Sequence, residues 1–156
     1  MFERILIICT GNICRSPIAD VLLNRQLSLV NHNTTITSAG TDALLGFPAD
    51  EPAQVLMLAR GLDLSAHRAR QVSLAATRRA DLILVMQKYH LDSIVALDPT
   101  ARGKTFLLGH WTAGEIPDPY QRGEEVYAQV LALIDGAVDS WVTKIVRPPS
   151  PARAAS

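Results

Sequence analysis

The residues of this chain with the clearest chemical potential lie in one short segment between Cys9 and Ser16. Gly11 and Asn12 both tolerate a positive φ angle, so the backbone there can curl and direct successive N–H groups toward an anion. Arg15 can hold two oxygens of that anion through its planar guanidinium group. We therefore predict a phosphate-binding loop made of Thr10, Gly11, Asn12, Ile13, Cys14, Arg15 and Ser16.

Cys9 comes directly before this loop, where the donors that bind phosphate would also stabilise a thiolate. A thiolate in that place can attack a phosphate ester and form a cysteinyl-phosphate, while Arg15 and the backbone amides stabilise the transferred group. Ser16 can donate a hydrogen bond to the sulfur and assist its departure when water hydrolyses the intermediate. The alternative is a core cysteine in an ordinary turn between a strand and a helix, beside a surface arginine.

Hydrolysis of a phosphate ester also requires an acid that protonates the leaving oxygen. Asp118 lies between Pro117 and Pro119, and the two prolines stiffen a loop that could hold its carboxylate over a pocket. An aspartate followed by proline is equally typical of a helix N-cap. The residues alone therefore leave both interpretations of Asp118 open.

The elements that must position these residues favour an α/β fold. Arg4–Ile8 and Leu82–Met86 are continuous apolar runs, typical of strands buried on both faces, and a helix with Ser16 as its capping residue follows the loop. Further strands are expected at Thr34–Ser38 and Lys104–Leu108. Further helices are expected at Pro52–Gly61, at Val72–Arg79, after the strand Leu82–Met86 as far as about Leu97, and from Pro119 to Ile145. We predict an open, mostly parallel four-stranded sheet with helices on both faces and the phosphate-binding loop after the first strand.

Length and composition limit the remaining options. A chain of 156 residues predicts one domain, which we place at residues 1–147, with a disordered tail at residues 148–156. Fifteen Lys and Arg balance fifteen Asp and Glu, which argues against nucleic acid as a partner and against a broad membrane surface. No apolar run is long enough for membrane insertion, and the two cysteines are too close in sequence for a disulfide framework, so we expect a reduced, cytoplasmic setting.

The segment Ile8–Pro17 resembles the signature of the low-molecular-weight protein tyrosine phosphatases, Val/Ile-Cys-x-Gly-Asn-x-Cys-Arg-Ser-Pro. The resemblance continues through Thr37–Thr41, His67–Gln71, Asp81–Leu84 and Asp118–Tyr120. Gly109–Trp111 together with Glu115–Tyr120 is similar to the bacterial branch that acts beside tyrosine kinases of exopolysaccharide export.

This resemblance implies a role for several residues. Asp118 would be the general acid and then the base that activates water, and Asn12 would brace the loop through bonds to Ser38 and His67. Leu44 and Tyr120 would form the pocket rim against a phenyl ring. His32, His90 and His110 lack metal-ligand spacing and are treated as structural or surface residues. Because the loop is tight, Cys14 is also a candidate redox partner that forms a reversible disulfide with Cys9.

The predicted activity is hydrolysis of phosphotyrosine, with no cofactor and no metal, by a cytoplasmic monomer that phosphate and other oxyanions inhibit. The expected partner is a phosphotyrosine protein, a bacterial tyrosine kinase. Two related chemistries compete: an arsenate reductase would need cysteines beyond Cys14, and a phosphocysteine carrier would have to preserve the phosphocysteine, against which Arg15 and Asp118 argue. A phosphotyrosine-binding module without catalysis is a third alternative, which turnover of an aryl phosphate would exclude.

Overall fold

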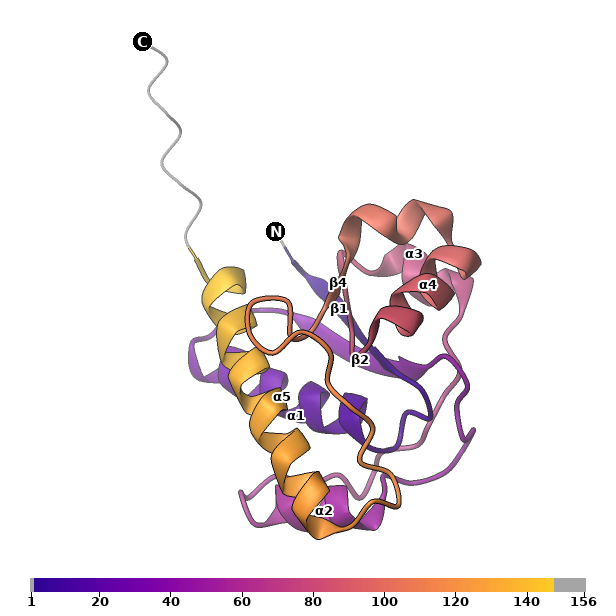
Figure 1. Ribbon diagram of the computed structural model, residues 1–156. Helices are drawn as coiled ribbons and strands as arrows, with labels where there is room; N and C mark the ends of the chain where they lie inside the picture. Colours follow the sequence, from indigo (N-terminus) through magenta and orange to yellow (C-terminus); the bar gives the residue numbers. More distant parts are fainter. Residues whose placement is uncertain (1, 148–156) are drawn as a thin grey trace.

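The computed structural model describes residues 2–147 and builds one open sheet with helices on both faces (Figure 1). The strands are β1 (Arg4–Cys9), β2 (Thr35–Gly40), β3 (Leu82–Val85) and β4 (Thr105–Leu107). The helices are α1 (Arg15–Leu29), α2 (Glu51–Leu58), α3 (Leu74–Arg79), α4 (Lys88–Leu97) and α5 (Glu124–Ile145), with a 3₁₀ turn at Pro99–Lys104. The predicted tail at residues 148–156 lies outside the described residues, so the expected boundary at residue 147 stays a prediction.

The sheet has the strand order β2-β1-β3-β4, and every neighbouring pair is parallel. The predicted α/β fold with four strands is confirmed. Strand β1 is central, and its side chains alternate between two cores. Ile5 and Ile7 pack into the larger core with α1 and α5, whereas Leu6 and Ile8 pack into a smaller core on the opposite face with Ile94 of α4.

The strand order places a functional site at the carboxyl end of β1. The chain leaves β1 through α1 toward β2 on one side, while β3 pairs with β1 on the other side. Ligands of open α/β sheets bind in the crevice where the strand order reverses in this way. The loop after β1 and the segment after β3 therefore meet at this edge.

Element ends differ from the sequence prediction in ways that have local causes. Helix α1 begins at Arg15 with Cys14 as its N-cap, so Ser16 is not the capping residue and its hydroxyl is free for other contacts. Helix α2 ends at Leu58 rather than at Gly61, and a glycine still closes it: Gly61 has a φ angle of 74°, and the Leu62 N–H donates to the Met57 carbonyl. Helix α5 begins at Glu124, six residues after Asp118, which excludes Asp118 as its N-cap.

The long connection between β4 and α5 is fixed at both ends by buried residues. Leu108 is fully buried and its carbonyl accepts a 2.7 Å hydrogen bond from the Trp141 indole of α5. Ile116 is also fully buried, and its N–H donates to the Met86 carbonyl, just after β3, at 2.9 Å. A connection of this length in a compact domain is typically functional, and these anchors hold its last part against the carboxyl end of the sheet.

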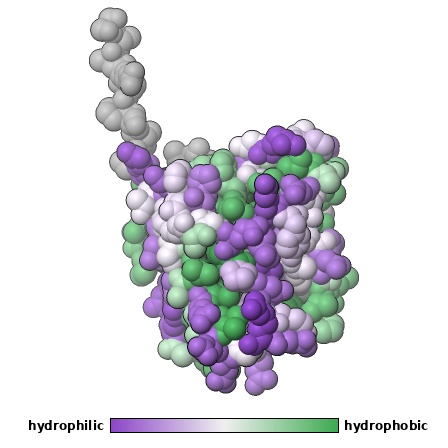
Figure 2. Space-filling view, viewed as in Figure 1, coloured by the Kyte–Doolittle hydropathy of each residue, from purple (hydrophilic) through white to green (hydrophobic). Residues whose placement is uncertain are grey.

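Figure 2 shows apolar residues gathered in a band beside α5, flanked by hydrophilic residues. Within residues 2–147, no helix combines the length and the apolar character needed to cross a membrane.

Candidate active site

The loop between β1 and α1 curls as predicted, but only one of its two permissive residues adopts a left-handed conformation. Asn12 has a φ angle of 59°, which reverses the chain inside the loop. Gly11, which also tolerates a positive φ angle, does not adopt one. The Leu44 side chain packs close to Gly11 instead, 3.7 Å from the position that a Cβ would occupy.

The carbonyl groups of the loop point outward and are bonded to neighbouring segments. The chain after β2 donates to three of them: Thr41 N–H to Cys9 O, Asp42 N–H to Thr10 O, and Leu44 N–H to Gly11 O, at 3.0 to 3.1 Å. The His67 ring nitrogen Nε2 donates to Asn12 O at 2.7 Å, and Asp50 N–H donates to Ile13 O at 2.8 Å. Five successive carbonyls are therefore held away from the centre of the loop.

The N–H groups of the same loop are left for a ligand. Among the described residues, none accepts a hydrogen bond from a backbone N–H of residues 11–16. Because consecutive unbonded amides that face one point form an anion-binding nest, and α1 adds the positive end of its dipole, this geometry is suited to a phosphate group. Phosphate binding by this loop stays a prediction that the arrangement favours.

Cys9 ends β1 beneath this nest, with 2% of its surface exposed. Its Sγ lies 2.9 Å from the Ser16 hydroxyl, and that hydroxyl oxygen also accepts a 2.8 Å hydrogen bond from Asn12 Nδ2. Since the Asn12 amide can only donate at Nδ2, the hydroxyl hydrogen of Ser16 is free to point at the sulfur. Ser16 can therefore stabilise negative charge on Cys9.

Asn12 is fully buried and joins the loop to two further segments. Its Nδ2 also donates to Ser38 Oγ at 3.0 Å, and its Oδ1 accepts the Arg70 N–H at 3.0 Å. Ser38 and His67 are the residues predicted to bond to Asn12. Both contacts are present, although His67 bonds to the backbone carbonyl of Asn12 rather than to its side chain. Burial lowers the pKa of His67, although the hydrogen bond to the Asn12 carbonyl acts in the opposite direction.

Arg15 brings a buried positive charge to the nest, with only 1% of its surface exposed. Its Nη1 donates to Gln87 Oε1 at 2.6 Å and to Ile116 O at 2.8 Å, and its Nη2 lies 3.4 Å from Thr10 Oγ1. Its buried Nε has no hydrogen-bond partner among the described residues. A buried guanidinium N–H without a partner is costly, and an oxyanion bound in the nest would supply the missing acceptor.

One residue that no sequence motif pointed to, His90, supports the neighbours of Arg15. His90 is fully buried, its Nδ1 accepts the Gln87 N–H at 3.0 Å, and its Nε2 lies 2.8 Å from Thr10 Oγ1. Tyr89 also bonds to the Thr10 hydroxyl. The available signal was positional, because these residues follow β3, the strand that lies beside β1 in the predicted parallel sheet.

His90 is held as a neutral ring. Burial, with the neighbouring Arg15 guanidinium as a second cause, lowers the pKa of His90 to about 3. Because Nδ1 accepts a backbone hydrogen bond, the proton of the neutral ring is on Nε2, and this N–H donates to Thr10. His90 thus orients Gln87 and Thr10, which both contact Arg15.

Asp118 lies across the pocket entrance from Arg15. Its carboxylate is half exposed, and its Oδ2 lies 3.9 Å from Arg15 Nη2. Its Oδ1 accepts the Tyr120 N–H at 3.0 Å, which fixes the side chain in a short turn. The carboxylate can therefore reach both solvent and a group bound in the nest.

These residues surround a pocket of about 210 Å³ at the carboxyl end of β1. Its lining includes Arg15, Asp118 and both predicted rim residues, Leu44 and Tyr120. Asp42 also lines the pocket and was not foreseen from the sequence. Leu45 is 71% exposed and is not part of the lining.

Cys14 shares the loop with Cys9 but has a different environment. Its thiol donates to Asp50 Oδ2 at 3.6 Å, and the same oxygen accepts a 2.6 Å hydrogen bond from the Tyr127 hydroxyl. Burial raises the pKa of the Cys14 thiol far above its ordinary range. Cys14 is therefore a protonated thiol in the resting loop, and both cysteines are free.

Comparison with known proteins identifies one family. Residues 4–149 match the family model described as low molecular weight phosphotyrosine protein phosphatase. The chain is 42% identical to the low molecular weight protein-tyrosine-phosphatase Ptp of Acinetobacter johnsonii, over 92% of this chain and 99% of that protein.

Two solved structures have the same fold. The tyrosine phosphatase Wzb from Escherichia coli K30, in complex with sulphate, matches with a TM-score of 0.87 and 45% identity, covering 93% of this chain and 99% of that one. Vibrio vulnificus Wzb, in complex with benzylphosphonate, matches with a TM-score of 0.86 and 39% identity, covering 92% of this chain and 99% of that one.

The environment of His90 predicts a pH-dependent loss of stability. Because its pKa is lowered on folding, the unfolded chain binds the extra proton first, so the contribution of His90 is fully present above its unfolded pKa of about 6.5 and declines as pH falls. We expect His90→Gln to reduce the slope of unfolding free energy between pH 6.5 and 4, by up to about 1.4 kcal/mol per pH unit. Urea unfolding at several pH values measures this slope. The exposed His110, changed to Gln, is the control and should leave the slope unaltered; equal slopes in all three proteins would contradict the neutral state of His90.

Proposed function

The chain belongs to the low molecular weight phosphotyrosine protein phosphatase family, and from this premise we propose that Cys9, Arg15 and Asp118 carry the hydrolysis of phosphotyrosine. The observation that supports these roles most directly is the nest itself. Its amides lack acceptors among the described residues, and Arg15, whose buried Nε has no partner there, lines the same pocket. Of the anions bound by the two Wzb proteins, sulphate is tetrahedral like inorganic phosphate, and benzylphosphonate resembles an aryl phosphate monoester.

The first step would transfer the phosphoryl group to the enzyme. The Cys9 thiolate attacks phosphorus, the S–P bond forms, and the bond between phosphorus and the phenolic oxygen breaks. Arg15 and the loop amides bind the three remaining oxygens, whose charge is spread in the transition state. Asp118, in its protonated form, gives its proton to the leaving phenolate.

The second step would release phosphate. The Asp118 carboxylate takes a proton from water, the water oxygen attacks phosphorus, and the S–P bond breaks. Cys9 leaves as a thiolate, and the hydroxyl hydrogen of Ser16, 2.9 Å away, stabilises the returning charge. The cycle balances, because the proton given to the phenolate is replaced by the one taken from water.

Competing chemistries fit the residues less well. The whole chain has two cysteines, both in this loop, so a reductase relay through later cysteines is not available. A phosphocysteine carrier has no use for a carboxylate placed 3.9 Å from the phosphate-binding guanidinium. The comparisons likewise name phosphatases rather than either alternative.

Cys9→Ser tests the nucleophile. A serine hydroxyl stays protonated in this position, so turnover of an aryl phosphate should fall by roughly 10³-fold or more. The fold and phosphate binding should persist, and phosphate should still raise the melting temperature of the variant. Substantial residual turnover by the pure variant would refute the assignment.

Asp118→Asn tests the general acid. Removing the acid should cost about 10²–10⁴-fold in rate on phenyl phosphate and much less on an ester with a good leaving group, which needs little protonation. The control is Asp42→Asn, which changes the other carboxylate of the pocket lining and should leave the ratio of the two rates unchanged. Equal losses on both esters in Asp118→Asn would reduce this residue to a structural part of its turn.

Cys14 would protect the nucleophile from oxidation. Peroxide oxidises the Cys9 thiolate to a sulfenic acid, and the Cys14 thiol then displaces water from it to form a disulfide. The Cys14 thiol must first leave its hydrogen bond with Asp50, so its motion precedes the bond. A thiol reductant restores both cysteines.

Mild peroxide followed by dithiothreitol should therefore restore the activity of the wild type but not of Cys14→Ser, which remains active before oxidation. Activity after reduction and the mass of the Cys9 peptide are the two measurements. Full recovery of Cys14→Ser would assign protection to another route.

The pocket favours phosphotyrosine over phosphoserine. Cys9 is 2% exposed, so the reacting group must reach a buried sulfur, and a flat ring can pack against Leu44 and Tyr120, which line the pocket. We further propose, from the similarity of Gly109–Trp111 and Glu115–Tyr120 to one bacterial branch, that the physiological partner is a tyrosine kinase of exopolysaccharide export.

Two measurements test substrate and partner. The kcat/KM on a phosphotyrosine peptide should exceed that on the matched phosphoserine peptide by at least about 100-fold, and Tyr120→Ala should narrow the difference. Comparable values would defeat the specificity proposal.

In the source bacterium, a Cys9→Ser strain should accumulate kinase phosphotyrosine; unchanged phosphotyrosine and polysaccharide would defeat the partner proposal alone.

A further inference from the structure

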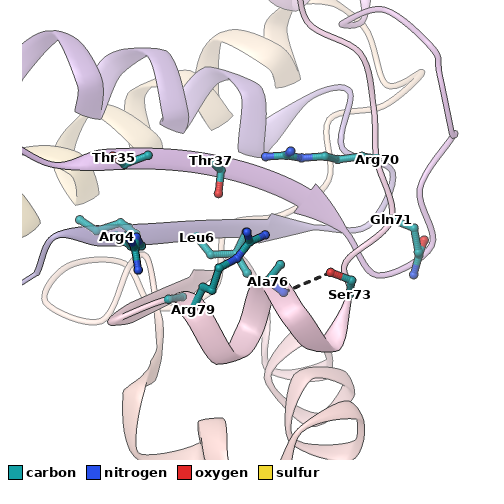
Figure 3. Close-up of a pocket in the computed structure, with 11 residues that line it drawn as sticks. Arg4, Leu6, Thr35, Thr37, Arg70, Gln71, Ser73, Ala76 and Arg79 are labelled. Carbon is teal, nitrogen blue, oxygen red and sulfur yellow. Dashed lines mark hydrogen bonds between the residues drawn. The ribbon is translucent and has the colours of Figure 1, made fainter.

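A second cavity, of about 320 Å³, lies over β1 and β2 and extends to α3 (Figure 3). It is larger than the catalytic pocket, shares no lining residue with it, and none of the roles above uses it. Its polar lining consists of three arginines, three hydroxyl residues and one glutamine: Arg4, Arg70, Arg79, Thr35, Thr37, Ser73 and Gln71.

The charges of this cavity are of one sign. No aspartate or glutamate lines it, although the chain as a whole has equal numbers of acidic and basic residues. The guanidinium groups of Arg4 and Arg79 form no ion pair or hydrogen bond within residues 2–147, where the ion pairs involve Arg15 and Arg60. Asp20 and Asp81 exert a field on Arg70 and Arg4, but neither belongs to the lining.

The three arginines come from separate parts of the chain and converge on one space. Arg4 begins β1, Arg70 precedes the short segment that leads to α3, and Arg79 ends α3. In Figure 3, Arg79 reaches from α3 across β1, and the Thr37 hydroxyl on β2 points toward the same space. Arg4, Arg70 and Arg79 are exposed, and like charges gathered on one surface repel each other, so a bound anion would reduce that repulsion.

We propose that this cavity is a binding site for the diphosphate or triphosphate group of a small molecule. In the catalytic pocket, one guanidinium and a nest of amides would bind a single phosphate group. Three guanidiniums around a larger space match a longer anion that carries several charges, and guanidinium groups bind phosphate oxygens through paired hydrogen bonds. The hydroxyls of Thr37 and Ser73 would bond the remaining oxygens.

Arg70 is unsuitable as the test residue because it also supports the catalytic loop. Its Nε donates to Ser38 O at 2.9 Å, and its backbone N–H holds Asn12 Oδ1. Arg79 and Arg4 have no such contacts, so Arg79→Ala and Arg4→Ala remove charge from the cavity alone. Arg78→Ala is the matched control, since Arg78 is an exposed neighbour on α3 that does not line the cavity.

The experiment titrates tripolyphosphate, and separately ATP, into the full chain and follows backbone amide shifts by NMR. Inorganic phosphate is present throughout at a concentration that fills the catalytic pocket, so that oxyanion binding there is constant. We expect saturable shifts at Thr37, Ser73 and Ala76, and an affinity at least about tenfold lower in Arg79→Ala and in Arg4→Ala, which is about 1.4 kcal/mol for each. Arg78→Ala should bind as the wild type does.

The outcomes separate the two sources of the anion and the failure of the proposal. Equal affinity for tripolyphosphate and ATP indicates recognition of the phosphate chain alone, whereas tighter binding of ATP indicates that the cavity also contacts the nucleoside; both support the site. Absence of saturable shifts at the cavity with either probe, or equal losses in Arg78→Ala and Arg79→Ala, would overturn it. Turnover of an aryl phosphate and the melting temperature of each variant confirm that it is folded, and neither depends on the proposal.

Discussion

The buried guanidinium of Arg15 is the interaction on which the rest of the site depends. Transfer of this charge from water to a place where 1% of it is exposed costs several kcal/mol unless polar groups surround it. Three separate segments supply those groups: Gln87 after β3, Ile116 O in the connection to α5, and Thr10 in the loop itself. The requirement to solvate one cation therefore draws together three parts of the chain that are distant in sequence.

The same requirement explains why the neighbouring polar groups are arranged in layers. His90 donates to Thr10 and accepts from the Gln87 backbone, so the two groups that contact Arg15 are themselves held. On the other side, Asn12 links Ser16, Ser38 and the backbone of Arg70, and the outward carbonyls of the loop are all bonded. Rigid surroundings of this kind keep the amides aimed at one point before any ligand arrives, which is the condition for electrostatic catalysis.

The sequence predicted those features that depend on short-range chemistry. The apolar runs at β1 and β3 could only be strands buried on both faces, and the loop after β1 had the residue types of an anion site next to a cysteine. Two kinds of feature were out of reach. The contact of Leu44 with Gly11 depends on the path of the chain after β2, and the bond of His90 to Thr10 depends on the packing of α4 against the sheet. Such contacts between distant segments leave no periodic pattern in either segment.

Cys9 and Asp118, the two side chains proposed to react, differ in their exposure to solvent. Cys9 is 2% exposed, which limits contact of its sulfur with bulk solvent. The carboxylate of Asp118 is half exposed, although it lies within 3.9 Å of Arg15. The role proposed for Asp118, to give one proton to the leaving oxygen and take one from water, benefits from contact with solvent in each cycle, whereas the role proposed for Cys9 does not. Exposure of the Asp118 side chain is compatible with a fixed position. The backbone is restrained by the prolines on both sides of Asp118 and by the buried Ile116, while the carboxylate stays in reach of water.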